Sequence, residues 1–250
     1  MAGHSKFKNI QHRKGAQDKK RAKIFTRLVR EIIVSSKIGG TDPSSNPRLR
    51  TALVSARAQN LPKDRINKAL STRDDDNAND YSEIRYEGFL GGGIALIIET
   101  LTDNKNRTVA SIRSILNKAG GNLGEQGSVS FLFDKIGEII FNAKCQNDFD
   151  KFIEDAIESG ADDIIEIMPE NEEESKKYVI YCESDDYNQC LEKITNIYKE
   201  EGDLIESNII WKAKNIIDFN DDEKKEKILK VIEKIEDDDD VQNVFLNIDI

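Results

Sequence analysis

Apolar residues in the first third of the chain recur every three or four positions. Between residues 18 and 37 they are Ile24, Phe25, Leu28, Val29, Ile32 and Ile33. This spacing places them on one face of an amphipathic helix. The pair Gly39-Gly40, which follows directly, is a typical helix end. We therefore predict a helix over about 18–37.

Two shorter helices are predicted after this one. Asn46 is a favourable N-cap, and Pro47 suits the first helical position. The apolar positions of this second helix and of a third that opens at Pro62 are Leu49, Leu53, Ala56, Ile66, Ala69 and Leu70. Short links between the three helices predict a small bundle. The acidic, Asn-rich run 74–80 has almost no apolar residue and is typical of a linker.

After residue 81 the pattern changes to strands and helices in alternation. The first elements expected are strands at 84–89 and 94–100 around Gly91–Gly93, a helix at 107–119 and a strand at 129–133. A β-α-β-β-α-β series follows, with strands at 137–141, 163–168, 178–182 and 204–211 and helices at 148–159 and 185–201. A helix at 221–236 and a strand at 241–248 come last. The β-α-β-β-α-β series between residues 137 and 211 is that of a ferredoxin-like unit.

The segment 81–133 lacks a second helix and a closing strand, and the last helix and strand of the chain supply both. We therefore predict an α+β protein, in which an N-terminal helical bundle is followed by two ferredoxin-like α+β domains, one inserted in the other. The predicted domains are a basic arm and three-helix domain at 1–73, a discontinuous domain at 81–134 plus 214–250, and an inserted domain at 136–213.

Charge is distributed unevenly along the chain. The net charge of the whole protein is −10. Residues 1–73 carry eighteen Lys and Arg against four Asp and Glu, whereas residues 74–250 carry nineteen against forty-three. Such an asymmetry indicates a polyanionic partner at the basic end. The acidic remainder repels a polyanion, so we expect contact to be confined to the basic segment 1–73.

The basic residues of this segment are the main candidates for a binding site. Residues 1–15 are basic and poor in apolar side chains, and we expect a flexible arm there. The predicted nucleic-acid-binding residues are Lys6, Phe7, Lys8, His12, Arg13, Lys14, Lys19, Lys20, Arg21, Lys23, Arg27, Arg30, Arg50 and Arg57. The cations would neutralise phosphates and release counterions, and Phe7 offers a stacking ring. The alternative interpretation is an ordinary solvated helix face with a disordered tail.

Other classes of site find little support. Two His and three scattered Cys give no zinc-ligand spacing, and the acidic runs are more typical of solvated surface than of a metal site. Both histidines, His4 and His12, lie in the basic arm, so a Ser-His-Asp or Cys-His site is implausible. We expect no catalytic residues, no metal and no cofactor. No apolar run approaches the ~18 residues of a membrane helix, and few cysteines suit a reducing compartment. We therefore expect a cytoplasmic, non-enzymatic protein with no membrane partner.

Seven stretches, in order from the first residues to the last ten, give the chain a family resemblance. They are Ala2-Gly3-His4-Ser5-Lys6 with His12-Arg13-Lys14; Asn46-Pro47-Arg48-Leu49-Arg50; Leu61-Pro62-Lys63-Asp64; Tyr86-Glu87-Gly88; Thr102-Asp103-Asn104-Lys105-Asn106-Arg107-Thr108; Gly120-Gly121-Asn122-Leu123-Gly124-Glu125; and Asp240-Val241-Gln242-Asn243-Val244. In these the chain resembles the YebC/PmpR family, which includes the mitochondrial translational activator of cytochrome oxidase subunit I.

The resemblance implies a helical N-terminal domain, two α+β domains with one inserted in the other, and a regulatory role. Bacterial members are described as probable transcriptional regulators that bind DNA, and other members act in translation at the ribosome. A basic, amphipathic N-terminus also suits a mitochondrial transit peptide. We favour nucleic-acid contact because the resemblance to mature proteins begins at the first residues.

Two positions depart from the family pattern. Phe7 stands where the family usually has Trp, so a ring remains for stacking but the indole donor is lost. Leu90-Gly91 replaces part of a Gly-Pro-Gly-like turn. Gly91–Gly93 lacks the Gly-Lys-Ser/Thr of a phosphate loop, which favours a hairpin turn. The polar loop of Asn104, Asn106 and Arg107 suits contact with RNA or protein and turn formation about equally.

Four functions compete on this evidence, and an enzyme is the fourth and weakest because no catalytic constellation is present. The first is a DNA-binding regulator of gene expression. The second is a ribosome-associated translation factor that contacts ribosomal RNA, and the third is a protein-interaction scaffold built on the α+β domains. The expected partner is DNA or ribosomal RNA, and we expect a monomer.

Overall fold

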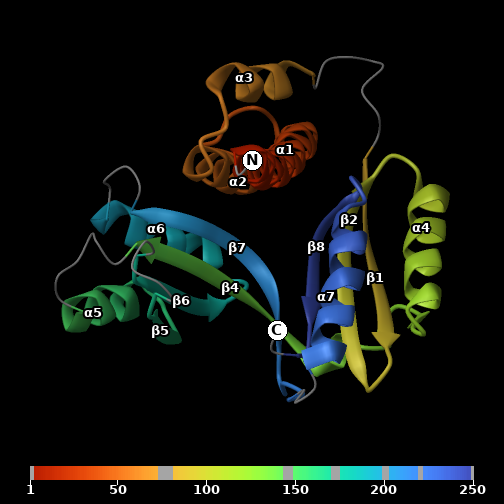
Figure 1. Ribbon diagram of the computed structural model, residues 1–250. Coiled ribbons are helices and arrows are strands. Elements are labelled where there is room, and N and C mark those ends of the chain that lie inside the picture. The colour runs from red at the N-terminus through yellow and green to blue at the C-terminus, as the bar shows by residue number, and fades with distance from the viewer. Residues whose placement is uncertain are drawn as a thin grey trace. The chain divides into compact units, whose positions relative to one another are not determined.

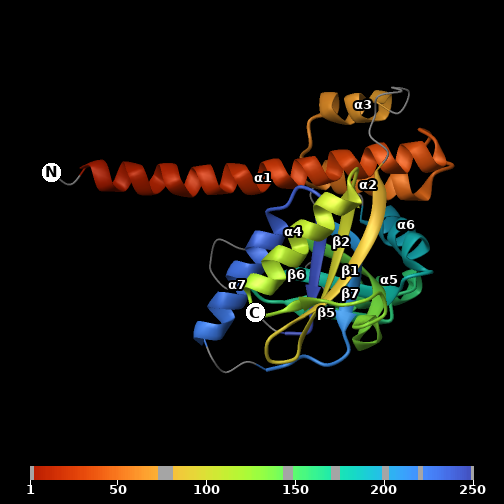
Figure 2. The same cartoon turned by 90° about the vertical axis from the view of Figure 1, so that its right-hand side faces the viewer.

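A computed structural model describes residues 3–72, 81–142, 149–169, 175–198, 203–218 and 222–248, with the side chains of the first helix described from residue 21 onward. The chain forms two compact units, Met1–Ala78 and Asn79–Ile250. Figures 1 and 2 show the elements of each unit.

The first unit consists of three helices. These are α1 (Gly3–Gly39), α2 (Pro47–Ala58) and α3 (Lys63–Ser71). Their apolar faces form one core, whose fully buried members include Ile32, Leu49 and Ala56. The three predicted helices are thus present, and the bundle buries the residues expected from the three-and-four spacing.

The prediction of a flexible arm over residues 1–15 is wrong for residues 3–15, because α1 begins at Gly3 (Figure 2). The sequence lacks an apolar stripe there, which suggested an arm. However, no proline interrupts residues 3–39, and adding residues to an existing helix is far easier than nucleating one. Packing of the C-terminal half of α1 supplies the nucleus. An internal glycine such as Gly15 costs only about 1 kcal/mol.

Asn46 joins the end of α1 to the start of α2. Its side-chain Nδ2 donates to the carbonyls of Ser35 and Gly40, at 2.8 Å each, and its Oδ1 accepts from Leu49 N at 3.1 Å. A side chain at Gly39 would collide with this amide, since a Cβ there would lie 2.6 Å from it. One buried asparagine therefore satisfies the last carbonyls of one helix and the first N–H groups of the next.

The second unit contains two antiparallel four-stranded sheets. Sheet A has the order β3-β1-β2-β8, from β1 (Ser82–Leu90), β2 (Ile94–Thr102), β3 (Asn122–Leu123) and β8 (Val241–Leu246). Helices α4 (Lys105–Lys118) and α7 (Asp222–Glu236) pack on one face over Leu96 and Ile98, with Ile112 of α4 in the same core. Gly91–Gly93 forms the predicted hairpin turn, because Leu90 pairs with Ile94.

Sheet B has the order β5-β6-β4-β7, from β4 (Phe133–Asn142), β5 (Asp163–Ile167), β6 (Lys177–Glu183) and β7 (Leu204–Ala213). Helices α5 (Phe149–Ser159) and α6 (Tyr187–Ile197) cover one face around Phe141 and Phe152. This is the ferredoxin-like arrangement, in the predicted β-α-β-β-α-β order. The α+β fold class is confirmed.

Strand β8 closes sheet A beside β2, although the two strands are far apart in the chain (Figure 1). All of sheet B lies in the interval between them. This pairing is the one that the discontinuous domain requires. The predicted boundaries 1–73, 81–134 plus 214–250, and 136–213 stay a prediction.

The expected strand at 129–133 is wrong. A 3-10 helix occupies Ser130–Leu132, and β4 begins only at Phe133. The cause is Glu87, whose Oε2 accepts from Val129 N at 2.8 Å and from Ser130 N at 2.9 Å. Because those N–H groups bond a carboxylate, they are not available to a strand ladder.

Candidate nucleic-acid interface

The first unit is rich in cations where its side chains are described. Residues 21–72 contain eleven Lys and Arg and three acidic residues. The cations lie on all three helices rather than on one. Long basic side chains extend their charged ends to water while their stems cover apolar surface. The unit therefore presents a positive surface built from α1, α2 and α3.

Helix α1 contributes Arg21, Lys23, Arg27 and Arg30. Arg21 is exposed, and the other three are partly exposed. Lys23, Arg27 and Arg30 are four and three residues apart and share one face, whereas Arg21 lies on the side of Phe25, four residues further on. The next turn of the same helix buries Ile32 and Ile33 in the core. The packed apolar face thus leaves Lys23, Arg27 and Arg30 on the other side of α1, while Arg21 stays beside Phe25.

Phe25 of α1 contacts two arginines, Arg21 of its own helix and Arg65 of α3. The guanidinium of Arg21 lies 5.3 Å from the centre of the Phe25 ring, and that of Arg65 lies 5.8 Å from it. Both are within cation–π range. The ring therefore holds two cations from different helices against one apolar platform.

Arg65 was not among the predicted site residues, and neither were its exposed neighbours Lys63 and Lys68 on α3. A signal was present in the sequence, because Arg65 and Lys68 stand three apart, opposite the apolar Ile66 and Ala69. What the sequence did not show is that Arg65 meets the Phe25 ring of α1.

On α2 the predicted residues are Arg50, which is partly exposed, and Arg57, which is exposed. Arg48, two residues before Arg50, has a different role. Its guanidinium forms a two-point ion pair with Glu31 of α1, at 2.6 and 3.0 Å. Such paired contacts are geometrically specific. Arg48 thus neutralises an acidic residue in the middle of the basic unit.

The other acidic residues of this part are engaged locally. Asp42 accepts from the backbone N–H of Ser44 at 2.9 Å and from its hydroxyl at 2.6 Å. The bonds from the Ser44 hydroxyl and N–H lower the pKa of the Asp42 carboxyl below its ordinary value. Asp64 lies in the first turn of α3, where a negative charge favours the helix. Each of these anions has a local structural role.

Eight predicted residues lie on α1 before residue 21, and their side chains are outside the described part. They are Lys6, Phe7, Lys8, His12, Arg13, Lys14, Lys19 and Lys20. Of the predicted set, the structure thus places Arg21, Lys23, Arg27 and Arg30 on α1 and Arg50 and Arg57 on α2. Whether they bind nucleic acid stays a prediction.

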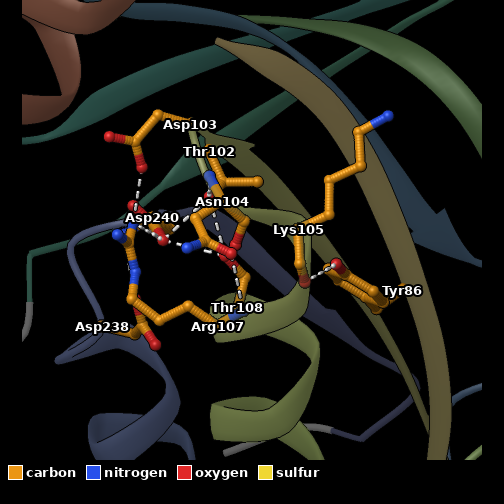
Figure 3. A network of polar contacts seen from close by, with 9 residues as sticks. All are labelled: Tyr86, Thr102, Asp103, Asn104, Lys105, Arg107, Thr108, Asp238 and Asp240. Carbon is orange, nitrogen blue, oxygen red and sulfur yellow. Dashed lines mark hydrogen bonds and ion pairs between the residues drawn. The ribbon is translucent and has the colours of Figure 1, made fainter. Parts of the chain in front are cut away.

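A second polar cluster, in the other unit, surrounds Asp240 (Figure 3). The carboxylate of Asp240 is almost fully buried, and its Oδ2 accepts from Arg107 Nη2 at 2.7 Å, Thr108 Oγ1 at 2.8 Å and Thr102 Oγ1 at 3.0 Å. Arg107 also donates to Asp103 at 2.7 Å. The cluster ties the start of β8 to the start of α4.

Electrostatics keeps this cluster ionised. Burial raises the pKa of the Asp240 carboxyl, but the bonds from Arg107, Thr108 and Thr102 outweigh it, so the pKa lies below its ordinary value. Asp240 in turn raises the pKa of the Arg107 guanidinium. Asn104 caps α4 by accepting from Arg107 N at 3.1 Å. Asn104 and Arg107, for which partner contact and turn formation were equally plausible from the sequence, thus have structural roles.

The Glu87 carboxylate accepts hydrogen bonds from the glycine-rich loop that follows α4. Burial raises the pKa of its carboxyl, yet the N–H groups of Val129, Gly127 and Ser130 together lower it below its ordinary value. The carbonyl of Glu87 also accepts from Gly124 N at 2.8 Å. The loop after α4 is therefore held close to β1 by one carboxylate and its own backbone.

The described residues contain no group of three or more His, Cys, Asp or Glu placed to hold a metal ion. Cys182 and Cys190 are free and buried in the core of sheet B. Cys145 lies outside the described residues. Within the described part, no helix is both long and apolar enough to cross a membrane.

Family models match both units of this chain. One, described as the N-terminal domain of the TACO1/YebC protein, covers residues 5–74. The other, described as the second and third domain of TACO1/YebC, covers residues 81–248. The chain belongs to the TACO1/YebC family. The predicted resemblance is confirmed.

Individual relatives of the TACO1/YebC family agree with this assignment. Proteins of Rickettsia bellii and Rickettsia felis, each named probable transcriptional regulatory protein, are 51% identical to the whole of this chain, which covers 94% and 95% of their lengths. A crystal structure of a conserved hypothetical protein from Aquifex aeolicus has a TM-score of 0.78 and 35% identity, over 92% of this chain and 90% of that one.

Within each unit, stretches that carried the TACO1/YebC resemblance make structural contacts. The Thr102–Thr108 stretch and Asp240 form the buried cluster of Figure 3. Glu87 bonds the loop that follows Gly120-Gly121. Asn46 and its neighbours form the joint between α1 and α2. In this chain the stretches around Asn46, Glu87, Thr102–Thr108 and Asp240 therefore build the fold.

Proposed function

We propose that this protein is a non-enzymatic regulator of gene expression that binds nucleic acid through its basic helical unit. The observation that carries the proposal is the surplus of cations on α1, α2 and α3, where the acidic residue at the centre, Glu31, is paired with Arg48. Phosphate backbones attract such a surface, and the release of counterions drives binding.

DNA is the first candidate partner. The relatives in Rickettsia are named probable transcriptional regulatory proteins, and this supports a role in transcription. Cations at Arg21, Arg57 and Arg65 suit contact with phosphates, which position a protein on a duplex without reading sequence.

Structured RNA, including ribosomal RNA, is the second candidate. Cations spread over three helices suit a large RNA surface recognised by its shape and backbone. This alternative gives a translation factor instead of a transcription regulator. The two differ in the partner and not in the surface that is used.

Fluorescence anisotropy with the full-length protein tests the common part of the proposal. A labelled DNA duplex and a structured RNA are titrated at several salt concentrations. The variant Arg57→Glu/Arg65→Glu changes two exposed cations of the basic unit. Its matched control, Lys227→Glu/Lys230→Glu, makes the same charge change on α7, where both side chains are exposed.

We expect the first variant to lose at least about tenfold in affinity at low salt and to reduce the slope of log affinity against log salt by about two. The control should retain the wild-type slope. Equal losses in both variants would show a general charge effect and contradict the proposal. Tighter binding to one DNA sequence than to a random duplex favours transcription, whereas co-sedimentation with ribosomes that disappears in the first variant favours translation.

A further inference from the structure

Sheet B has two unlike faces. On one of them Ile139, Phe141 and Ile180 are fully buried beneath α5 and α6. Because side chains alternate along a strand, the residues between these belong to the opposite face. That face, called here the open face, is formed by the alternate positions of β4, β5, β6 and β7 that include Glu138, Ile140, Ile165, Val179, Tyr181 and Glu206.

Aliphatic side chains form a row across three strands of the open face. Ile165 of β5 pairs with Val179 of β6, which pairs with Ile140 of β4. Val179 is buried, at 1% exposed, whereas Ile165 is 38% exposed and the next outward residue of β5, Ile167, is 44% exposed. The row is thus anchored at its centre and accessible at its β5 end.

A polar row lies beside the aliphatic one. Asp163 pairs with Tyr181, and Tyr181 pairs with Glu138. Glu206 stands opposite Ile140, diagonal to Glu138. Lys212 Nζ lies 3.7 Å from the centre of the Tyr181 ring. Lys177 pairs with Ile167 at the β5 end of the apolar row. The carboxylates Glu138, Asp163 and Glu206 of the open face thus stand with the cations Lys177 and Lys212.

The Glu138 carboxyl lies near a second carboxylate of the open face, Glu206. Burial raises the pKa of Glu138 and the Glu206 carboxylate adds to the rise, although the hydrogen bond with Tyr181 and the charge of Lys212 lower it. Burial also raises the pKa of Tyr181 to about 12, and the Glu138 charge contributes. A cation placed between Glu138 and Glu206 would relieve this repulsion.

Sheet A offers a contrast within the same unit. Helices α4 and α7 cover its first face. Its second face packs Ala95 and Ile97 against Phe133 of β4 and Trp211 of β7. Both faces of sheet A are therefore used for the fold. Sheet B uses one face and leaves aliphatic residues accessible on the other.

We propose that the open face of sheet B binds a basic, aliphatic segment of a partner protein. Its aliphatic row would contact the aliphatic side chains of the segment, and Glu138 and Glu206 would receive its lysines or arginines. Nucleic acid and anionic membranes are disfavoured because the carboxylates repel them. The proposal does not depend on the nucleic-acid surface, which lies in the other unit.

The test measures binding of a synthetic peptide of alternating lysine and isoleucine to the full-length protein by calorimetry. A peptide of alternating glutamate and isoleucine is the probe control. The variant Glu138→Gln/Glu206→Gln removes two charges from the open face. Its matched control, Glu223→Gln/Glu226→Gln, removes two charges from exposed positions of α7.

We expect the lysine peptide to bind and the glutamate peptide not to bind. The open-face variant should weaken binding about fivefold or more, because each carboxylate lost removes one ion pair with the peptide. The α7 control should leave binding unchanged. Equal weakening by both variants would mean unspecific attraction to an acidic protein and overturn the proposal. So would the absence of binding by the lysine peptide.

A second measurement identifies the occupant in cells. A photo-crosslinking residue replaces Ile167 in one protein and Leu229 of α7 in another, two positions of similar exposure, 44% and 42%. We expect Ile167 to crosslink to a Lys/Arg-rich segment of another protein, with a loss in the Glu138→Gln/Glu206→Gln background. Crosslinks to a second copy of this chain, to nucleic acid, or at a level equal to that of Leu229 would overturn the proposal.

Discussion

The basic helical unit and the acidic α+β unit use charged side chains in opposite ways. In the helical unit the cations Arg21, Arg57 and Arg65 are exposed, while the anion Glu31 is paired. In the α+β unit the carboxylates of Glu87 and Asp240 are buried and bonded on several sides. These cations of the helical unit are therefore exposed, whereas these carboxylates of the α+β unit are bonded within the fold.

The comparison also separates what a partner can contact from what holds the protein together. An exposed cation near a phosphate changes affinity and hardly changes stability. Removing either a buried carboxylate or the groups bonded to it destabilises the fold strongly. The following variants are ordered by the size of the expected effect.

Replacement of Asp240 should have the largest effect. Asp240→Ala leaves Arg107 and the hydroxyls of Thr102 and Thr108 without their shared acceptor. We expect a loss of about 3–5 kcal/mol in the free energy of unfolding. Urea unfolding followed by the fluorescence of Trp211, the one tryptophan, measures it. The exposed neighbour gives the control, Asp239→Ala. A loss no larger than that of the control would contradict the structural role.

The effect of Asp240 should depend on pH. Because its pKa is lowered in the folded protein, its contribution is complete above the ordinary carboxyl pKa and is lost as pH falls through the lowered value. The stability difference between wild type and Asp240→Ala should therefore shrink on acidification below about pH 4. A difference that stays constant throughout the acid range would show that the carboxylate charge is not what matters.

Glu87→Gln should have a smaller effect of the same kind. It removes a charge that accepts from Val129 N and Ser130 N. Buried donors that lose a charged acceptor are expected to lower the free energy of unfolding by roughly 1–3 kcal/mol. Amide hydrogen exchange should accelerate at residues 127–130 before it does in β2. Unchanged exchange there would mean that the loop is held by its backbone alone.

Asn46→Ala tests the helical unit. The variant loses the cap on Leu49 and the two bonds to Ser35 and Gly40. Removal of such a cap is expected to cost roughly 0.5–2 kcal/mol. Far-UV circular dichroism during heating measures this, with the exposed Asn67→Ala on α3 as control. If the comparison between the units is correct, this variant lowers nucleic-acid affinity only at temperatures where the bundle unfolds.

The smallest effect is expected for Arg65→Ala, which removes one exposed cation from the Phe25 ring. It should weaken nucleic-acid binding about threefold at low salt, less at high salt, with little change in stability. Arg48→Ala is the variant to compare with it, because Arg48 forms an ion pair with Glu31. Arg48→Ala should lower stability, and Arg65→Ala should lower affinity.

Much of the fold followed from the sequence because local periodicity encodes it. The spacing of Ile24 through Ile33 predicted the packed half of α1, and the β-α-β-β-α-β order of the elements predicted sheet B. The missing closing strand of the second unit was inferred from the count of elements, and β8 does pair with β2. The candidate cations followed from charge counting alone.

The failures have one physical cause. The strand expected at 129–133 has strand-like residues, but Glu87, which stands far earlier in the chain, captures its N–H groups. Arg65 was overlooked because its aromatic platform, Phe25, lies on a different helix. The extent of α1 was underestimated, because a helix continues without an apolar stripe once its far end is packed.

By itself the sequence determined the elements, the α+β class, the family and the separation of positive from negative charge, since each depends on neighbouring residues or on composition. Only the tertiary structure decided that Asp240 neutralises Arg107, that Glu87 shapes the loop before β4, and that one face of sheet B remains open. These outcomes depend on which distant residues become neighbours. Local pattern does not encode that, because it emerges only when the strands pair and the helices pack.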